Sequence, residues 1–466
     1  MTLLGIIVLL STATLVIFIG IKLSNISEAP PVPVLDSVWW GPGEPAELDV
    51  VDTRIRPFKV DVPQKVIDDL HQRLNKSRPL TPSLEGANQH YGIHKALLSE
   101  IVEFWKTSYD WKQREKWLNQ YPQFKTNIQG LDIHFIHVKP AKTGNLKVLP
   151  LLLLHGWPGS VREYYDVIPK LTSPRKDYDF VFEVIVPSLP GYGFSQGASK
   201  PGLAVPQVAV IFRNLMQRLG YEKYYVHGGD WGALIVHTMS ILYADEILGM
   251  HSHMCNSDSP LGMIKLILGS LYPPLVVDKR FEDRVYPLWN FLEFTMLEMG
   301  YMHLQATKPD TVGVALNDSP VGLAAYIIEK FTTWTNRAWK DRPDGGLKEK
   351  YTYTDLLDNV MIYWVTNSIT TSVRLYAESL SKATFALGLS KLPVLVPSAC
   401  ARFPHELAYS PDSILSLTYK NLVHTSDLND GGHFAAFEVP DLLADDIWIG
   451  IRKIEAFHKR QKESTP

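Results

Sequence analysis

An aspartate stands where a strand is predicted to turn into a helix. A strand pattern at Tyr224–Val226 leads into GGDWG at 228–232, and a helical pattern follows at Ala233–Tyr243. Small residues beside a nucleophile permit the strained turn that presents it to substrate. The nucleophile of such turns is usually serine, but here it is Asp230, a carboxylate that forms an ester with an alkyl carbon without first losing a proton. The pattern indicates displacement at a saturated carbon, and the alternative is a glycine-rich turn with an N-capping aspartate.

A second segment, HGWPG at 155–159, follows the continuously apolar run Val148–Leu154. In enzymes with this kind of turn, backbone N–H groups after such a strand and after the nucleophile form an oxyanion hole. We therefore expect the backbone N–H groups of Trp157 and Trp231 to hold the developing negative charge. The Trp157–Pro158 bond is a candidate for the cis form, because X–Pro bonds have a small cis penalty. His155 is expected to have a structural role.

The segment GGHF at 431–434 places His433 after the last predicted strand and before the last predicted helix. The chain order of nucleophile, acid and histidine makes His433 the expected base. The acid that orients it should follow a strand between the nucleophile and the base. Asp258 follows the predicted strand Gly249–Met254, and Glu406 follows the predicted strand Val394–Val396. Spacing does not choose between these two carboxyl groups.

Strand and helix patterns alternate through most of the chain, and Val205–Leu219 is a long example of a helix between strands. Such alternation is typical of a mostly parallel sheet with helices on both faces. Between about 256 and 385 the strand signal disappears and aromatic-rich helical patterns replace it, which predicts an inserted helical cap. The other predicted strands are Ile133–Val138, Phe182–Val186 and Leu422–Val423.

These patterns divide the chain into five predicted parts. Residues 1–22 form a membrane anchor, and residues 23–145 form an N-terminal extension with the first strands. The two halves of the α/β core are residues 146–255 and 386–466. The helical cap, residues 256–385, lies between them.

The predicted anchor rests on residues 3–21, which carry no charged side chain. As a helix this run spans about 28 Å at about 1.5 Å per residue, close to the hydrocarbon thickness of a bilayer. A cleaved signal peptide is the alternative, but no basic residue precedes the run. Lys22 follows it, which favours a cytoplasmic catalytic body. Glycosylation triplets at Asn25, Asn75 and Asn317 would fit a lumenal body.

The composition excludes several classes of protein. With 466 residues, 45% of them hydrophobic, the chain is globular rather than disordered. A net charge of −3 gives no basic surface for nucleic acid. Two cysteines make neither a disulfide framework nor a Cys-rich metal site, and no HExxH motif, P-loop or complete dinucleotide fingerprint is present. His251 and His253 are a close pair near the catalytic edge, but we expect no metal or other cofactor.

The motifs together resemble the microsomal-type epoxide hydrolases of the α/β-hydrolase superfamily, and the resemblance covers most of the chain. Within that family the chain is most similar to insect juvenile hormone epoxide hydrolases, notably across Gly202–Ile235. The motifs are WWGP at 39–42, GLDIHFIHVKP at 130–140, HGWPG at 155–159, PGYGFS at 190–195, GGDWG at 228–232, GYMH at 300–303 and GGHFAAFE at 431–438.

The resemblance implies a role for each site residue. Asp230 is the nucleophile, His433 is the base, and Glu406 rather than the competing aspartate is the orienting acid. Tyr301 and Tyr376, both in the cap, donate hydrogen bonds to the epoxide oxygen. The enzyme would open an epoxide to a vicinal diol through an ester on the nucleophile, which water activated by His433 then hydrolyses.

The resemblance also implies an apolar epoxide substrate, such as juvenile hormone or a related lipid epoxide, and a place in the endoplasmic reticulum membrane. A general xenobiotic epoxide hydrolase is one alternative. A haloalkane dehalogenase, with the same aspartyl ester, is a second. A catalytically silent, membrane-tethered lipid-binding protein is a third. The sequence predicts no particular oligomeric state.

Overall fold

A computed structural model describes residues 30–44 and 51–464 of the chain. The predicted anchor at 1–22 lies outside these described residues. Within them, no single helix is long and apolar enough to cross a membrane. Two consecutive helices, Pro309–Asp318 and Pro320–Thr333, are together long and apolar enough, but the chain bends by 119° between them.

The described residues contain one nine-stranded sheet with the order β1-β2-β3-β5-β4-β6-β7-β8-β9. The pairs from β1 to β5 are antiparallel, and all pairs from β5 through β4 to β9 are parallel. The predicted mostly parallel sheet is therefore confirmed. The strands are β1 (Arg56–Phe58), β2 (Gln123–Ile128), β3 (Leu131–Val138), β4 (Lys147–Leu154), β5 (Phe180–Pro187), β6 (Tyr224–Gly228), β7 (Ile247–Ser252), β8 (Ser398–Arg402) and β9 (Leu422–Asp427).

Only one predicted strand is wrong. Val394 forms an isolated bridge with Tyr419, and the real strand β8 begins at Ser398. Pro393 and Pro397 flank the apolar residues that suggested a strand. Because proline has no backbone N–H to donate to a neighbouring strand, pairing is regular only beyond Pro397.

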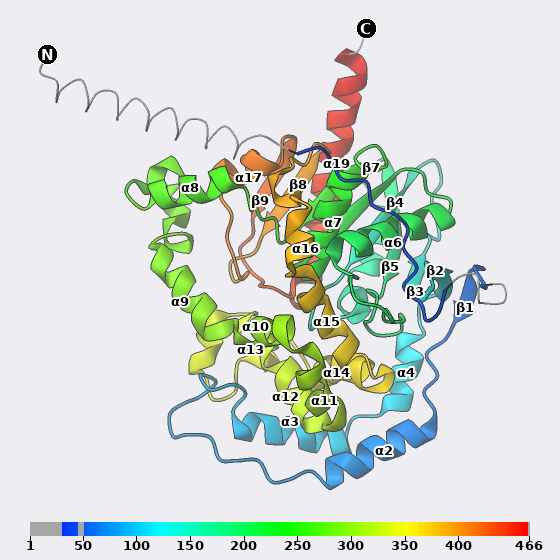
Figure 1. Ribbon diagram of the computed structural model, residues 1–466, viewed down its shortest axis with the longest axis vertical. Helices are drawn as coiled ribbons and strands as arrows, with labels where there is room; N and C mark the ends of the chain where they lie inside the picture. The colour runs from blue at the N-terminus through cyan, green and yellow to red at the C-terminus, as the bar shows by residue number, and fades with distance from the viewer. Residues whose placement is uncertain (1–29, 45–50, 465–466) are drawn as a thin grey trace, which may run out of the picture.

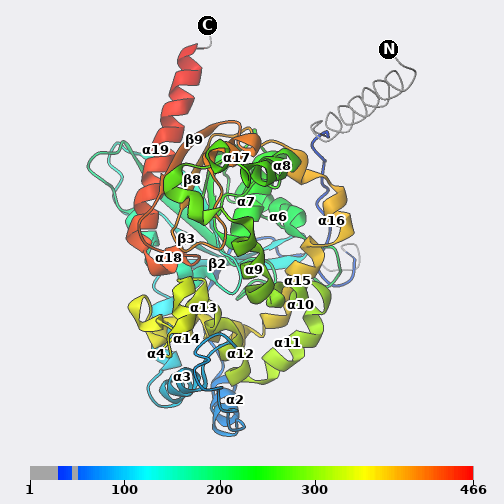
Figure 2. The ribbon, with the colours of Figure 1, turned by 90° about the vertical axis from the view of Figure 1, so that its left-hand side faces the viewer.

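Helices cover both faces of the sheet (Figures 1 and 2). α6 (Val205–Arg218) and α7 (Asp230–Leu242) pack together on one face, and α5 (Ile168–Thr172) and α19 (Pro440–Ser464) pack together on the other. The centre of the sheet between them is buried: every residue of β5 and of β6 is buried. Two short helices, α17 (Asp412–Thr418) and α18 (Ala435–Glu438), complete this part.

A block of helices lies between β7 and β8, and we call it the cap. The three helices that precede β2, α2 (Gln64–Asn75), α3 (Lys95–Thr107) and α4 (Trp111–Leu118), lie beside the middle helices of the cap, where α2 contacts α12 and α3 contacts α14 (Figure 1). The cap helices are α8 (Pro260–Gly269), α9 (Leu288–Glu298), α10 (Gly300–Thr307), α11 (Pro309–Asp318), α12 (Pro320–Ile328), α13 (Lys330–Thr333), α14 (Tyr353–Thr366), α15 (Ile369–Ser379) and α16 (Lys382–Ala386).

The two cysteines form a disulfide that no sequence pattern predicted. Cys255 follows β7, and Cys400 lies in β8. These strands are neighbours, and the register pairs Ser252 with Cys400, so the two Cα atoms come within 5.9 Å although 145 residues separate them.

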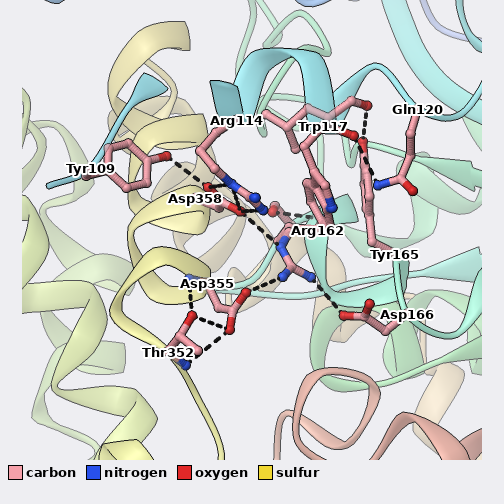
Figure 3. A network of polar contacts seen from close by, with 12 residues as sticks. Tyr109, Arg114, Trp117, Gln120, Arg162, Tyr165, Asp166, Thr352, Asp355 and Asp358 are labelled. Carbon is pink, nitrogen blue, oxygen red and sulfur yellow. Dashed lines mark hydrogen bonds and ion pairs between the residues drawn. The ribbon is translucent and has the colours of Figure 1, made fainter. Parts of the chain in front are cut away.

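A buried ionic network joins the core, the cap and the preceding helices (Figure 3). Asp358 of α14 is fully buried and binds the guanidinium groups of Arg114 from α4 and of Arg162, which lies in the short helix after the HGWPG segment. Tyr109 also donates to Asp358 at 2.9 Å. Arg162 reaches Asp355 at 2.7 Å as well. The network therefore fixes the loop after β4 against the cap.

We expect Asp358→Ala to lower the thermal unfolding midpoint strongly. Removing one partner of a buried ion pair leaves uncompensated buried charge and typically costs about 3–5 kcal/mol. Asp166→Ala is the matched control, since Asp166 pairs with the same Arg162 but is 52% exposed, and exposed pairs contribute about 0–1 kcal/mol. Scanning calorimetry of both variants measures the difference. Equal decreases in the unfolding midpoint of the two variants would show that burial does not increase the contribution of these ion pairs to stability.

Candidate active site

The register of the parallel strands brings the predicted site residues to one edge of the sheet. Leu154, the last residue of β4, pairs with Gly228, the last residue of β6. Gly228 in turn pairs with Ser252 at the end of β7. The loops that follow these strands therefore begin at the same level, which is where ligands bind in open α/β sheets.

Asp230 lies in a tight turn between β6 and α7. Its φ of +48° is in the left-handed region, which is uncommon for a non-glycine residue and is concentrated at functional sites. A Cβ atom on Gly232 would lie 2.1 Å from the carbonyl oxygen of Leu154, and one on Gly228 would lie 2.4 Å from the Gly232 carbonyl. Only glycine at both positions allows the turn to sit this close to β4. The predicted nucleophile turn is present.

The Asp230 carboxylate is held from two sides. Oδ1 accepts a hydrogen bond from the backbone N–H of Trp157 at 2.7 Å. Oδ2 lies 3.3 Å from Nε2 of His433. The Trp157–Pro158 bond is cis, as the sequence suggested. Trp231 is in the first turn of α7, where backbone N–H groups have no acceptor within the helix and are free for a ligand.

Glu406, and not Asp258, is the carboxylate beside the base. Nδ1 of His433 lies 2.7 Å from Oε1 of Glu406, which also accepts the backbone N–H of Leu407 at 2.7 Å. The charge of Asp258 instead acts on His237 and Tyr419. The structure thus separates two carboxyl groups that spacing alone left equivalent.

Two opposing effects set the protonation of the base. Burial by itself lowers the pKa of His433, but the charges of Glu406 and Asp230 outweigh it and raise that pKa well above its ordinary value. Burial likewise works to raise the pKa of Glu406, but the His433 imidazolium lowers it overall. The two carboxylates therefore favour the protonated form of His433 in the free protein.

The two cap tyrosines lie against the tryptophans of the predicted oxyanion hole. The ring of Tyr301, in α10, stacks on Trp157 with centroids 5.2 Å apart and planes 9° apart. The ring of Tyr376, in α15, packs edge-on against Trp231 at 4.6 Å, and the two tyrosine rings are 5.9 Å apart. Burial is the main cause that raises the pKa of both phenols well above 10. Both phenols therefore stay protonated and can donate hydrogen bonds.

Two buried carboxyl groups near the base were not found from the sequence. Glu438 accepts the backbone N–H groups of Gly432 and Phe434, the residues on either side of His433, at 2.6 and 2.8 Å. Glu163 lines a small cavity together with Asp230 and His433. Burial raises the pKa of each of these glutamates to about 8. The only sequence signal was their place within or just after the two motifs that carry Trp157 and His433.

Other buried histidines near the site have structural partners. His155 accepts the backbone N–H of Leu189 at 3.1 Å, and burial lowers its pKa to about 4, so its predicted structural role is confirmed. His251 binds Asp446 at 2.9 Å and His227 at 2.9 Å. Residues 30–44 and 51–464 contain no group of three or more His, Cys, Asp or Glu that could hold a metal.

The chain matches two protein families. Residues 55–164 match the family described as epoxide hydrolase N terminus, and residues 150–399 match the α/β-hydrolase fold. Among curated proteins, juvenile hormone epoxide hydrolase 1 of Ctenocephalides felis is 55% identical over 91% of both chains. Epoxide hydrolase 1 of Oryctolagus cuniculus is 47% identical over 89% of this chain and 92% of its own.

A solved structure agrees with the sequence comparisons. The crystal structure of juvenile hormone epoxide hydrolase from the silkworm Bombyx mori superposes with a TM-score of 0.89 at 49% identity, covering 91% of this chain and all of that one. Identity at this level over nearly the whole length, together with the Asp230–His433–Glu406 arrangement, establishes the family. The chain belongs to the epoxide hydrolase family of the α/β-hydrolase fold and is an epoxide hydrolase.

Proposed function

We propose that the enzyme opens an epoxide through an ester on Asp230. The observation that carries the proposal is the carboxylate itself, with Oδ1 on the Trp157 N–H and Oδ2 beside His433. Oδ2 is free of the backbone and attacks an epoxide carbon, forming one C–O bond while the ring C–O bond breaks. Tyr301 and Tyr376 donate to the departing oxygen, which takes a proton from one phenol and becomes a hydroxyl. That phenolate later regains its proton, through water, from the His433 imidazolium.

Alkylation prepares the base for the second step. Esterified Asp230 has lost its negative charge, so one of the two charges that raise the pKa of His433 is gone. His433 therefore passes its proton through water to the phenolate, and the neutral imidazole can then accept a proton from the attacking water. The water attacks the carbonyl carbon of the ester, the resulting oxyanion forms on Oδ1, and the N–H groups of Trp157 and Trp231 stabilise it. The bond between the carboxyl carbon and Oδ2 then breaks, the diol oxygen takes the proton held by His433, and the new carboxyl group, which keeps a water oxygen, gives its own proton back to His433.

The cavity lined by Asp230, His433 and Glu163 is the proposed place of this water. A glutamate with a pKa of about 8 is mostly protonated at neutral pH, so Glu163 can donate a hydrogen bond to the water while His433 accepts its proton. This arrangement orients a water lone pair without placing a second negative charge beside the ester.

The role of Glu163 predicts a pH effect. Below about pH 8 the side chain is neutral, and above that pH it ionises and opposes the negative charge that forms on Asp230 during hydrolysis. We expect the rate of ester hydrolysis in the wild-type enzyme to fall as the pH rises past about 8. Glu163→Gln, which is neutral at every pH, should not show this fall. Single-turnover hydrolysis rates between pH 6.5 and 9.5 measure it, and an identical fall in the variant would assign the titration to another group.

For substrate we propose juvenile hormone or a related apolar lipid epoxide. Support comes from the named relatives, since the juvenile hormone epoxide hydrolase of Ctenocephalides felis is more similar to this chain than epoxide hydrolase 1 is. The aromatic surroundings of Tyr301 also suit an apolar substrate. The test is kcat/KM on juvenile hormone against styrene oxide. A clear preference for styrene oxide would favour a general xenobiotic epoxide hydrolase.

We also propose that residues 1–22 anchor the enzyme in the endoplasmic reticulum membrane, with the body in the cytoplasm as Lys22 suggests. Retention of the full chain in carbonate-washed membranes supports the anchor, and release overturns it. The Cys255–Cys400 disulfide is of a kind that persists mainly in oxidising compartments, and Asn75 is exposed. An N-linked glycan on Asn75 in cells would therefore place the body in the lumen and overturn the proposed orientation.

A further inference from the structure

The cap carries a concentrated apolar surface that the described protein does not cover. Of the 25 exposed large apolar side chains in the described residues, 13 lie between Leu261 and Leu297. We call these 13 side chains the α8–α9 surface. Monomeric soluble proteins rarely expose contiguous apolar patches of more than a few hundred Å², and larger ones mark interaction sites.

Helical spacing gathers these side chains on outward faces. Met263, Ile267 and Leu271 follow one another at four-residue intervals along and just beyond α8, and they are 57–86% exposed. Trp289, Leu292 and Met296 follow at three- and four-residue intervals along α9, and they are 51–77% exposed. Residues at such intervals lie on one face of a helix.

The opposite side of α9 leads to the catalytic site. Phe294 of α9 and Met299, which directly follows α9, pack against the core. Gly300 comes next in the chain and begins α10. Tyr301 then stacks on Trp157. The exposed apolar helix is therefore continuous with the helix that carries a proposed epoxide donor.

The charge of this segment points to an uncharged apolar partner. Residues 261–297 contain four basic and four acidic side chains, so the segment has no net charge. Attraction to anionic lipid headgroups or to an oppositely charged protein needs an excess of one sign. Insertion of apolar side chains into the boundary between lipid headgroups and acyl chains does not.

The position of the surface also fits a membrane. Pro30, the first of the described residues, lies against Gly388 just after α16, and α8 is at the same end of the molecule (Figures 1 and 2). Eight residues, 22–29, separate the uncharged run at 3–21 from Pro30. Eight extended residues reach at most about 30 Å. An anchor formed by that run would hold this end of the molecule against the bilayer.

We propose that the α8–α9 surface docks into the lipid bilayer as a second membrane contact, so that the cap faces the phase in which apolar epoxides dissolve. The inference rests on the proposed anchor and substrate class. Lipid is the proposed partner of this surface. The alternatives are protein partners, namely a second copy of the chain or segment 1–29 of the same chain.

The test places a reporter on the surface of the full-length enzyme. Met296→Cys and Leu268→Cys are labelled with an environment-sensitive fluorophore, and the native cysteines are occupied in their disulfide. Val314→Cys is the matched control, because Val314 is an apolar residue of α11 that is 71% exposed and lies outside the surface. The labelled enzymes are reconstituted in vesicles of uncharged phosphatidylcholine, some carrying nitroxide-labelled acyl chains.

Docking predicts a blue-shifted emission and nitroxide quenching at positions 296 and 268, and neither effect at position 314. The quenching should persist at high salt, since no charge attraction is involved. Water-like emission at positions 296 and 268 would overturn the proposal. A blue shift without nitroxide quenching would also overturn it, because protein rather than lipid would then cover the surface.

A charged variant gives an independent readout. Ile267→Glu combined with Leu271→Glu should reduce quenching at position 296 and raise KM for an apolar epoxide dissolved in vesicles by about tenfold, because ionised side chains resist insertion into apolar lipid. Unchanged quenching in this variant would overturn the proposal. Turnover of water-dissolved styrene oxide by this variant should stay at the wild-type level. If the wild-type enzyme itself does not turn over styrene oxide, the proposed chemistry is contradicted rather than the proposed docking. Val314→Glu is the control.

Discussion

The enzyme with both Tyr301→Phe and Tyr376→Phe is expected to lose nearly all of its alkylation activity. Opening an epoxide leaves negative charge on the substrate oxygen, one bond from the attacked carbon. Oriented donors in a buried pocket stabilise such charge more than bulk water does, and loss of one donor typically costs about 10²–10³ in rate. Each single Phe variant keeps one phenol and should be slowed substantially but remain active.

The measurement is pre-steady-state quenching of tryptophan fluorescence, because Trp157 and Trp231 lie beside the tyrosines and Asp230. Tyr326→Phe is the matched control, since the Tyr326 ring also packs against Trp157 but its hydroxyl donates to Gln305. If the double variant alkylates at the wild-type rate, the two tyrosines only pack the cap and do not assist epoxide opening. It would also remove the strongest distinction from dehalogenase chemistry, in which a halide leaves and needs no phenol.

The His433→Gln enzyme is expected to form the ester but not to hydrolyse it. Asp230 attacks without a base, whereas the water of the second step needs one, and a general base typically contributes about 10²–10⁴ in rate. Substrate should therefore accumulate as a covalent adduct on Asp230, which mass spectrometry of the intact protein detects. Absence of the adduct would mean that His433 acts before the ester forms.

The orienting acid provides a matched pair of variants for the same step. Glu406→Gln should slow hydrolysis, because the imidazolium loses the carboxylate 2.7 Å from its Nδ1. Asp258→Asn should hydrolyse the ester at close to the wild-type rate, since that carboxyl group acts on His237 and Tyr419 instead. The opposite pattern would contradict the assignment of the acid.

The sequence predicted those parts of the site that follow a strong strand or a distinctive motif. β4 ends in an apolar, buried run and β6 leads directly into the GGDWG motif, so their ends, and with them Trp157 and Asp230, can be placed from residue patterns alone. The acid could not be chosen, because Glu406 lies in a loop four residues beyond β8 and prolines displaced that strand from its apparent position. A loop sets side-chain direction by tertiary contacts, which spacing does not encode.

Other site residues depend on contacts between distant segments. Tyr301 and Tyr376 lie on separate cap helices and are brought together with Trp157 and Trp231 only by tertiary packing, so resemblance alone pointed to them. Glu163 acquires its raised pKa from burial beside the site, a property that no short pattern records. The disulfide likewise depends on β7 and β8 being neighbours, which required the sheet order.

In the ester mechanism an oxygen atom of Asp230, and not of solvent, enters the product of the first turnover of each enzyme molecule. A single turnover with enzyme in excess over substrate, carried out in H₂¹⁸O, tests it most directly. The expected diol contains no ¹⁸O, and the label appears in the Asp230 carboxylate, detected in the peptide that contains GGDWG. A diol whose new oxygen is fully derived from labelled water, with an unlabelled Asp230, would show direct attack by water and contradict the ester mechanism.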